Sequence, residues 1–235
     1  RYNGGGLLGM AAQIAYMIAG PAQTNGKIFE RLQFNDKHPT VDPVTGQTIE
    51  PVPFETTTLG WENLPPGQPL PVLNLTRLFV LTGSGTCSAS EAIMNGLRGA
   101  GVEVIQIGNT TCGKPYGFYP TDNCGTTYFT VQFKGVNAVG FGDYPLGFSP
   151  AAVDDGEALI AGCGVNDDFT KPLGDPGENR LEVALAYRDG QGCIAPASES
   201  QQLFSKPGIR LDDTEGWINQ SPFDSNRMLV RPERN

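Results

Sequence analysis

The sequence contains no apolar run of the length that a membrane-spanning helix requires, about 20 residues. The nearest candidate, residues 7–19 (LLGMAAQIAYMIA), is shorter and amphipathic, which predicts a helix of the core instead. Only 17% of the 235 residues are charged, the formal net charge is −9, and no run of basic residues occurs. Because phosphate contacts require clustered Lys and Arg, this balance argues against a nucleic-acid partner.

Histidine is nearly absent, which limits the bases available to an enzyme. The only one, His38, lies in the polar, proline-flanked stretch NDKHP, and we expect it at the surface rather than in a catalytic triad. Metal binding by the loop acids Asp143, Asp167 and Asp168 is also disfavoured. These acids have neither a matching histidine nor the regular spacing of a calcium loop, so we expect solvated carboxylates.

The five cysteines include no C-x-x-C pair, which argues against a zinc ribbon or a thioredoxin-like motif. The spacing is compatible with two local disulfides, Cys112 with Cys124 and Cys163 with Cys193, which would leave Cys87 as a free thiol. The alternative is five reduced, mostly buried thiols. Disulfides would indicate an oxidising compartment outside the cytoplasm.

Glycine (31 residues) and proline (19) are abundant, which is typical of a sheet-containing globular protein with many turns. Residues 21–75 form a long Pro-rich stretch, which indicates a functional loop or an insertion. We expect one domain over residues 1–193 and a tail over 194–235 that docks on it. Because the chain opens on RYNGGG without an initiator Met, we also expect part of the domain to precede Arg1.

The middle of the chain predicts a strand–helix–strand unit. Residues 77–82 and 102–107 have the apolar character of buried strands, and residues 91–100 between them have helical periodicity. A parallel strand pair with a right-handed crossover is the usual arrangement of such a unit. The residue pattern alone therefore predicts an α/β fold with at least one parallel strand pair.

Two further elements follow along the chain. Residues 126–133 alternate and are rich in Thr, Tyr, Phe and Val, which predicts a strand. Residues 174–187 predict a helix with Asp175 as its N-cap and Pro176 at its first position.

Three glycine-bounded corners carry residues suited to chemistry: GGG at 4–6, TCSASE at 86–91 and TTCGKP at 110–115. In an open α/β sheet such corners gather at the carboxyl ends of the strands, where sites form. The stretch Ser88-Ala89-Ser90-Glu91 has two interpretations. It matches a helix capping box, and it also suits a nucleophile elbow that presents a serine to a carbonyl.

A nucleophilic serine needs a base, and the lone histidine is poorly placed for that role. Lys114 is the candidate, because it sits in a tight G-K-P turn followed by aromatic residues. Burial among aromatic side chains would lower the pKa of a lysine enough for it to accept a proton. The alternative is an ordinary solvated loop lysine.

The three corners together resemble the C-terminal-processing (tail-specific) serine peptidases. That family carries D-L-R-x-N-x-G-G, S-A-S-E and T-x-G-K segments. Here they correspond to RYNGGG at 1–6, SASE at 88–91 and TCGK at 111–114, in the same order and at similar spacing. The resemblance extends over roughly the first 190 residues.

The resemblance implies an α/β fold of the ClpP/crotonase-like β-α spiral type. It implies a serine endopeptidase that cleaves extended or unfolded polypeptides near their C-termini, with Ser88 as nucleophile and Lys114 as base. Backbone amides of Gly5 or Gly6, together with Ala89, would form the oxyanion hole. The resemblance implies no metal or organic cofactor. It implies a periplasmic or secreted location of the bacterial type. It leaves open whether the protein forms a homo-oligomer.

Two observations about the family leave the identity of the base open. Some members orient the lysine with a Gln four residues later, where this chain has Phe118. Another branch uses a histidine base from earlier in its chain. The alternative is a catalytically silent relative that binds peptides or apolar ligands. An acyl-CoA-handling enzyme of the same general fold is disfavoured, because no basic cluster is available for a nucleotide phosphate.

Overall fold

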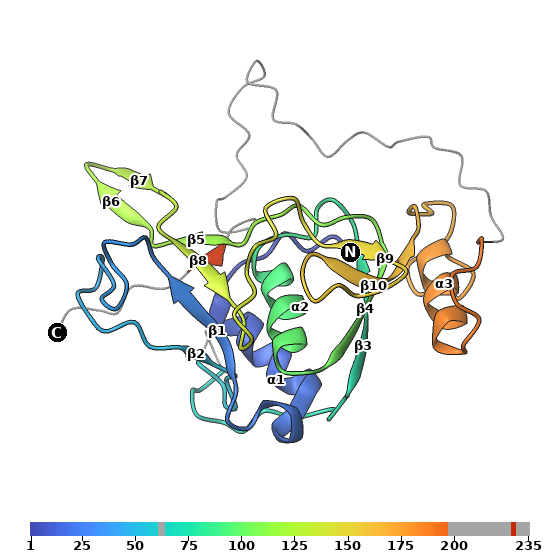
Figure 1. Cartoon of the computed structure of the whole chain (residues 1–235), viewed down its shortest axis with the longest axis horizontal. Helices are drawn as coiled ribbons and strands as arrows, with labels where there is room; N and C mark the ends of the chain where they lie inside the picture. Colours follow the sequence, from blue (N-terminus) through green and yellow to red (C-terminus); the bar gives the residue numbers. More distant parts are fainter. Residues whose placement is uncertain (61–63, 197–226, 229–235) are drawn as a thin grey trace, which may run out of the picture.

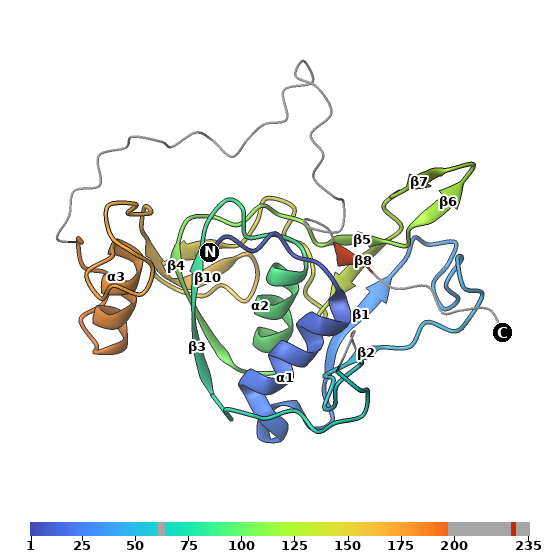
Figure 2. The same cartoon turned by 180° about the vertical axis from the view of Figure 1, so that it is seen from behind.

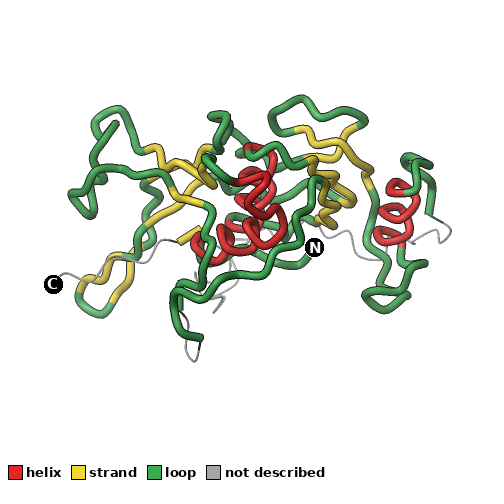
Figure 3. The backbone as a smooth tube through the Cα atoms, turned by 90° about the horizontal axis from the view of Figure 1, so that it is seen from below, coloured by secondary structure: helices red, strands yellow, loops and turns green. Residues whose placement is uncertain are grey.

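A computed structural model describes residues 1–60, 64–196 and 227–228 of the chain. The fold is a mixed α/β arrangement in which two helices lie between two sheets (Figure 1). Seen from below, these two helices cross one another with strands on either side, and the third helix stands apart (Figure 3). A small hairpin projects from one sheet, as both side views show (Figures 1 and 2).

One sheet is wholly parallel, with the order β3-β4-β10-β9. Its strands are β3 (Arg77–Thr82), β4 (Glu103–Gly108), β10 (Leu159–Gly164) and β9 (Ser149–Ala151). Helix α2 (Ala89–Gly99) connects β3 to β4, so the predicted strand–helix–strand unit with a parallel pair is confirmed. The pairing of β3 with β4 ends at Thr82 and Gly108. The corners TCSASE at 86–91 and TTCGKP at 110–115 both follow this edge of the sheet.

The second sheet is mostly antiparallel, with the order β11-β5-β8-β1-β2. Its strands are β11 (Arg227–Met228), β5 (Tyr116–Phe118), β8 (Phe133–Val136), β1 (Ile28–Gln33) and β2 (Val52–Pro53). Strands β1 and β2 lie within 21–75, so this stretch is not irregular throughout. Strand β1 was not predicted because the high proline content of 21–75 indicated a loop. Its residues nevertheless alternate between buried and exposed over most of the strand.

Helix α1 (Leu8–Thr24) packs against α2 between the two sheets. It extends beyond the predicted end because a second helical segment continues after a kink, where Gly20 has a positive φ of 68° and Pro21 follows. Helix α2 also lies close to β1. A Cβ atom at Gly96 would lie 2.6 Å from the Phe29 ring, so the helix can approach the strand only with glycine there.

Helix α3 (Asn179–Arg188) covers the other face of the parallel sheet, where Val183 and Ala184 share a buried cluster with Ile105 and Ile107. The predicted cap is corrected. Glu178 is the N-cap, and its carboxylate accepts hydrogen bonds from the first-turn amides. Asp175 does not cap the helix, because the helix begins only at Asn179.

Two strand predictions also need correction. The stretch 126–133 contains one short strand and the first residue of another. Its first part is β7 (Thr126–Tyr128), paired with β6 (Thr121–Asn123) in the projecting hairpin, whereas its last residue opens β8. Strand β10 was not predicted, because its sequence LIAGCG is rich in glycine. Gly162 allows close pairing with β4, because a Cβ there would lie 1.8 Å from the Gln106 carbonyl oxygen.

The predicted tail lies largely outside the described residues, since only 194–196 and β11 of the range 194–235 are described. Strand β11 pairs in parallel with β5. Across the described part of the chain, none of the helices combines the length and apolar character needed to cross a bilayer.

Candidate active site

Ser88 lies at the junction between the loop after β3 and the first turn of α2. Its backbone has a φ of 57° and a ψ of −114°, which is a strained conformation for a residue with a side chain. Such strain costs on the order of 1–3 kcal/mol and persists only when the surroundings enforce it. The residue is fully buried, and its Oγ makes no hydrogen bond within the described residues. A serine held in this way on a strand-to-helix turn has the form of a nucleophile elbow.

The capping interpretation of this stretch is confirmed in part. Glu91 accepts a hydrogen bond of 2.8 Å from the Ser88 amide, which is one half of a capping box. The Ser88 hydroxyl lies toward the Glu91 amide, as in the other half, but without a well-aligned hydrogen bond. The Ser88 hydroxyl therefore lies near the start of the helix without a strong hydrogen bond within the described residues.

The Glu91 carboxylate joins the serine corner to the lysine corner. It is fully buried and accepts hydrogen bonds of 2.8 Å from the amides of Gly113 and Lys114. The Thr111 hydroxyl also donates a short hydrogen bond to it. One oxygen, Oε2, lies 2.8 Å from both the Ser88 and the Lys114 amide nitrogens. Two residues that are far apart in sequence are thus held against the same atom.

A disulfide reinforces this junction. Cys87 is bonded to Cys112, with a Cα–Cα distance of 5.2 Å. The predicted pairing of Cys112 with Cys124 is wrong, because Cys124 lies exposed in the turn of the projecting hairpin and is the free cysteine. Proximity in sequence suggested the wrong partner, whereas the parallel sheet brings the two corners together. Cys163 is bonded to Cys193, which is the expected pair.

Lys114 is half-buried in the loop between β4 and β5. Burial lowers the pKa of its ammonium group below the ordinary value of 10.5, and the nearby charge of Glu91 offsets part of that effect. Phe118, which stands where some family members have a Gln, is buried and packs edge-on against Phe129 at 5.3 Å. A Phe ring has no hydrogen-bonding group, so it does not orient Lys114 as a Gln amide would.

The glycine segment at the start of the chain packs directly on the serine corner. A Cβ at Gly5 would lie 2.8 Å from the Ser88 Cβ and 3.0 Å from the Ala89 amide nitrogen, so only glycine fits there. The Gly5 amide donates to the Asn3 side chain at 2.9 Å. The Ser90 hydroxyl binds the Asn3 side-chain oxygen at 2.8 Å. Ser90 therefore fastens the glycine segment to α2, and this role was not identified from the sequence.

A buried ionic network holds the first residues of the chain. Arg1 binds Asp167 at 2.8 Å and Glu178 at 2.6 Å, and Arg180 binds Asp167 at 3.0 Å. The sequence predicted a solvated loop acid at Asp167, and this prediction is wrong. The Asp167 carboxylate is the shared acceptor of two guanidinium groups. Sequence spacing could not have indicated these ion pairs, because Arg1 is 166 residues from Asp167.

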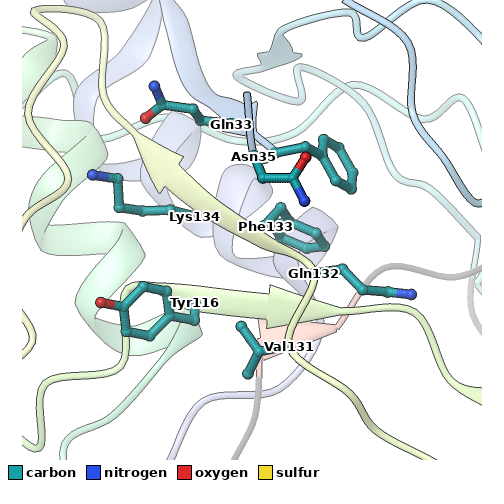
Figure 4. A pocket seen from close by; sticks show the side chains of 8 residues that line it. Gln33, Asn35, Tyr116, Val131, Gln132, Phe133 and Lys134 are labelled. Carbon is teal, nitrogen blue, oxygen red and sulfur yellow. The ribbon is translucent and has the colours of Figure 1, made fainter. Parts of the chain in front are cut away.

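A hollow of about 480 Å³ opens beside the lysine loop, on the antiparallel sheet (Figure 4). Tyr116, Lys134 and Gln33 form one row across β5, β8 and β1 in its lining. The Pro115 carbonyl accepts a hydrogen bond from the Gly135 amide at 3.0 Å, which brings the hollow within a few residues of Lys114. Of the eight lining residues, Lys134 alone is charged.

We predict that Glu91→Gln loosens the lysine loop. A Gln side chain offers one acceptor oxygen and turns an NH₂ group toward backbone amides, so at least one buried donor loses its partner. The free energy of unfolding should fall by about 1–3 kcal/mol, and the Gly113 and Lys114 amides should exchange faster in hydrogen-exchange measurements. Glu103→Gln, at an exposed position of β4, is the matched control. Unchanged exchange and stability in Glu91→Gln would show that the carboxylate does not hold the loop.

Comparison with known proteins identifies a structural relative. No protein-family model matches the sequence, and no curated protein matches it. Among solved structures, one from Bacteroides fragilis NCTC 9343, described as "Putative S41 protease", superposes with a TM-score of 0.59. It shares 25% sequence identity, and the match covers 81% of this chain.

The chain spans 43% of the length of that structure's chain, so it corresponds to less than half of its relative. The resemblance drawn from three short motifs is confirmed by the fold: this chain is a structural relative of the S41 proteases, the C-terminal-processing peptidase family.

Proposed function

We propose that this chain is the catalytic domain of a serine endopeptidase that cleaves extended or unfolded polypeptides near their C-termini. The observation that carries the proposal is the sharing of one carboxylate oxygen, Glu91 Oε2, by the amides of Ser88 and Lys114. A serine in an elbow conformation and a lysine with a lowered pKa are thereby held in neighbouring loops. These are the two groups that acyl transfer by a Ser–Lys dyad requires.

In the proposed mechanism, the Ser88 Oγ attacks the scissile carbonyl carbon while neutral Lys114 Nζ takes the hydroxyl proton. The tetrahedral intermediate collapses to an acyl-enzyme as Lys114 returns the proton to the leaving amine. Water then attacks the ester with Lys114 again as the base, and the carboxylic product leaves with Ser88 restored. No step requires a metal or an organic cofactor.

The oxyanion hole is assigned to the amides of Gly6 and Ala89. The Gly5 amide is already donated to the Asn3 side chain, which favours Gly6 among the two glycines considered from the sequence. Ala89 is the first residue of α2, where backbone amides lack intrahelical acceptors and the helix dipole favours negative charge. Donors of this kind stabilise the developing oxyanion.

The hollow beside the lysine loop supports recognition of a chain terminus. A lone cation among neutral amide and aromatic groups suits a carboxylate ligand, and Lys134 is that cation. On a chain with a formal charge of −9, a lining without an acidic residue is an unusual setting. We assign this hollow to the C-terminal carboxylate of the substrate or to the residues just before it.

The parallel sheet, the second sheet and the helices between them support a β-α spiral of the ClpP/crotonase type, with residues 1–193 as the peptidase domain and 21–75 as an insertion. Two disulfides are typical of proteins outside the cytoplasm, which supports a periplasmic or secreted location. Assembly into a homo-oligomer stays a prediction.

The second candidate is a catalytically silent relative that binds peptides. The buried ring of Phe118 favours it, because this ring occupies the position of a lysine-orienting Gln. In such a protein the serine elbow and the hollow would serve binding alone. Cleavage of an unfolded protein distinguishes the two candidates.

We predict that Ser88→Ala and Lys114→Ala each abolish cleavage of an unfolded protein such as reduced, alkylated casein. Loss of a nucleophile or its base lowers kcat by about 10⁴-fold or more in serine hydrolases. Ser84→Ala, an exposed serine of the same loop, is the matched control and should cleave normally. If Lys114→Ala keeps its activity while Ser88→Ala does not, the base lies elsewhere. If the wild-type protein cleaves none of a varied set of substrates, the silent relative is favoured.

We predict that kcat rises with pH through the pKa of Lys114, because only the neutral amine accepts the serine proton. Burial lowers that pKa, so the rise should lie below pH 10.5, and activity should be lost as the pH falls through it. The measurement is kcat against pH on a peptide without ionisable side chains. His38→Asn should leave the profile unchanged. A profile that moves with His38→Asn, or that rises only above 10.5, would contradict a depressed lysine base.

We predict that Lys134→Gln weakens the preference for a free C-terminal carboxylate. A charge-assisted hydrogen bond contributes about 1.5–3 kcal/mol, so KM for the free-acid peptide should rise roughly tenfold or more. The same peptide with a C-terminal amide should show little change. Lys37→Gln, which removes an exposed cation outside the hollow, is the matched control. Equal effects on acid and amide peptides would assign Lys134 to something other than the carboxylate.

A further inference from the structure

The loops that carry Ser88 and Lys114 lie beyond the strands that support them. The ladder between β3 and β4 ends at Thr82 and Gly108, and both loops continue past that edge. Three kinds of link then connect them. The Glu91 carboxylate accepts from both loops, the Cys112 amide donates to the Thr86 carbonyl at 3.0 Å, and one disulfide joins them covalently.

The disulfide is placed very close to both proposed reactive groups. Cys87 directly precedes Ser88, and Cys112 is separated from Lys114 by one residue. The strained backbone of Ser88 requires neighbours that over-determine its position. A covalent bond at the preceding residue supplies such a constraint, and the same bond restricts the lysine loop from the other side.

We propose that the Cys87–Cys112 disulfide is a positioning element of the Ser–Lys site, and that its reduction reversibly lowers turnover without unfolding the domain. This inference rests on the proposed peptidase function. The site would then be active in an oxidising compartment and suppressed by a dithiol reductant.

The redox step is ordinary thiol–disulfide exchange. A thiolate of the dithiol attacks one sulfur of the bond and forms a mixed disulfide, and its second thiol then closes the reductant's own disulfide. Two electrons and two protons pass to the protein, which is left with two thiols. Cys87 and Cys112 are both half-buried, so a small dithiol can reach the bond.

Reduction leaves the other links in place, which is why the domain should stay folded. The hydrogen bonds from Ser88, Gly113 and Lys114 to Glu91 do not involve sulfur. The loops would therefore remain near one another but with a wider range of relative positions. Because a small misplacement of reacting groups lowers the rate steeply, kcat should be affected more than KM.

The chain contains its own matched control. The second disulfide, Cys163–Cys193, joins β10 to the segment after α3 and has neither residue next to Ser88 or Lys114. The free thiol Cys124 is exposed and could exchange with either bond. All measurements therefore use a Cys124→Ser background.

The experiment compares three proteins in that background: the parent, Cys87→Ala/Cys112→Ala, and Cys163→Ala/Cys193→Ala. For each, kcat, KM and the pH profile of kcat are measured after oxidation, after reduction by dithiothreitol, and after reoxidation. EDTA is present throughout, because one ligand atom from each of Cys87, Glu91 and Cys112 lies within 4.8 Å of the others, and reduced thiols there could take up a stray metal.

We expect reduction of the parent to lower kcat by about tenfold or more with little change in KM. The rise of kcat should also move toward the ordinary lysine pKa, which a purely structural bond would not cause. Reoxidation should restore both. The Cys163→Ala/Cys193→Ala protein should respond like the parent, and the Cys87→Ala/Cys112→Ala protein should be slow in every state.

Full kcat in a folded Cys87→Ala/Cys112→Ala protein would overturn the proposal, as would a redox response that disappears with Cys163 and Cys193. If the oxidised parent cleaves nothing, the peptidase function itself fails. The link is then judged by hydrogen exchange at the Gly113 and Lys114 amides. Faster exchange on reduction supports the positioning role of the bond, and unchanged exchange overturns it.

Discussion

The buried carboxylate of Glu91 is the interaction on which the candidate site depends. It accepts hydrogen bonds from the amides of Ser88, Gly113 and Lys114 and from the Thr111 hydroxyl. A carboxylate is the side chain suited to this position, because its two oxygens accept several bonds and donate none. The same group caps helix α2, so the capping box and the serine elbow are one structure.

The parallel sheet explains why distant segments converge on that carboxylate. Strands β3 and β4 run in the same direction, so the loops that leave their carboxyl ends lie side by side. The N-terminal glycine segment is the third participant. It is held by Ser90 on α2 and by the ionic network of Arg1, Asp167 and Glu178. These contacts lie at the start of the segment whose Gly5 approaches Ser88 closely.

The surroundings of Lys114 differ from those in some members of the family by one side chain. Where some members of the family place a Gln that hydrogen-bonds the lysine, this chain buries Phe118 against another ring. Desolvation rather than a side-chain amide is then the main influence on the Lys114 pKa. Such an arrangement favours the neutral amine that a general base requires, although it gives the lysine less directional support. The Cys87–Cys112 disulfide restricts the loop that carries this lysine.

The sequence by itself determined the local units: β3 at its observed bounds, the helix that follows it, the parallel pair and the three corners with their motifs. These depend on periodicity, glycine positions and capping residues, which act over a few neighbours. Only the tertiary structure decided which corners touch. It paired Cys112 with Cys87 rather than with the nearer Cys124, converted Asp167 from a loop acid into an ion-pair partner, and gave Glu91 its second role. Strand β1 within the Pro-rich stretch and the glycine-rich β10 also became visible only through their partners, because strands are stabilised by pairing with distant residues.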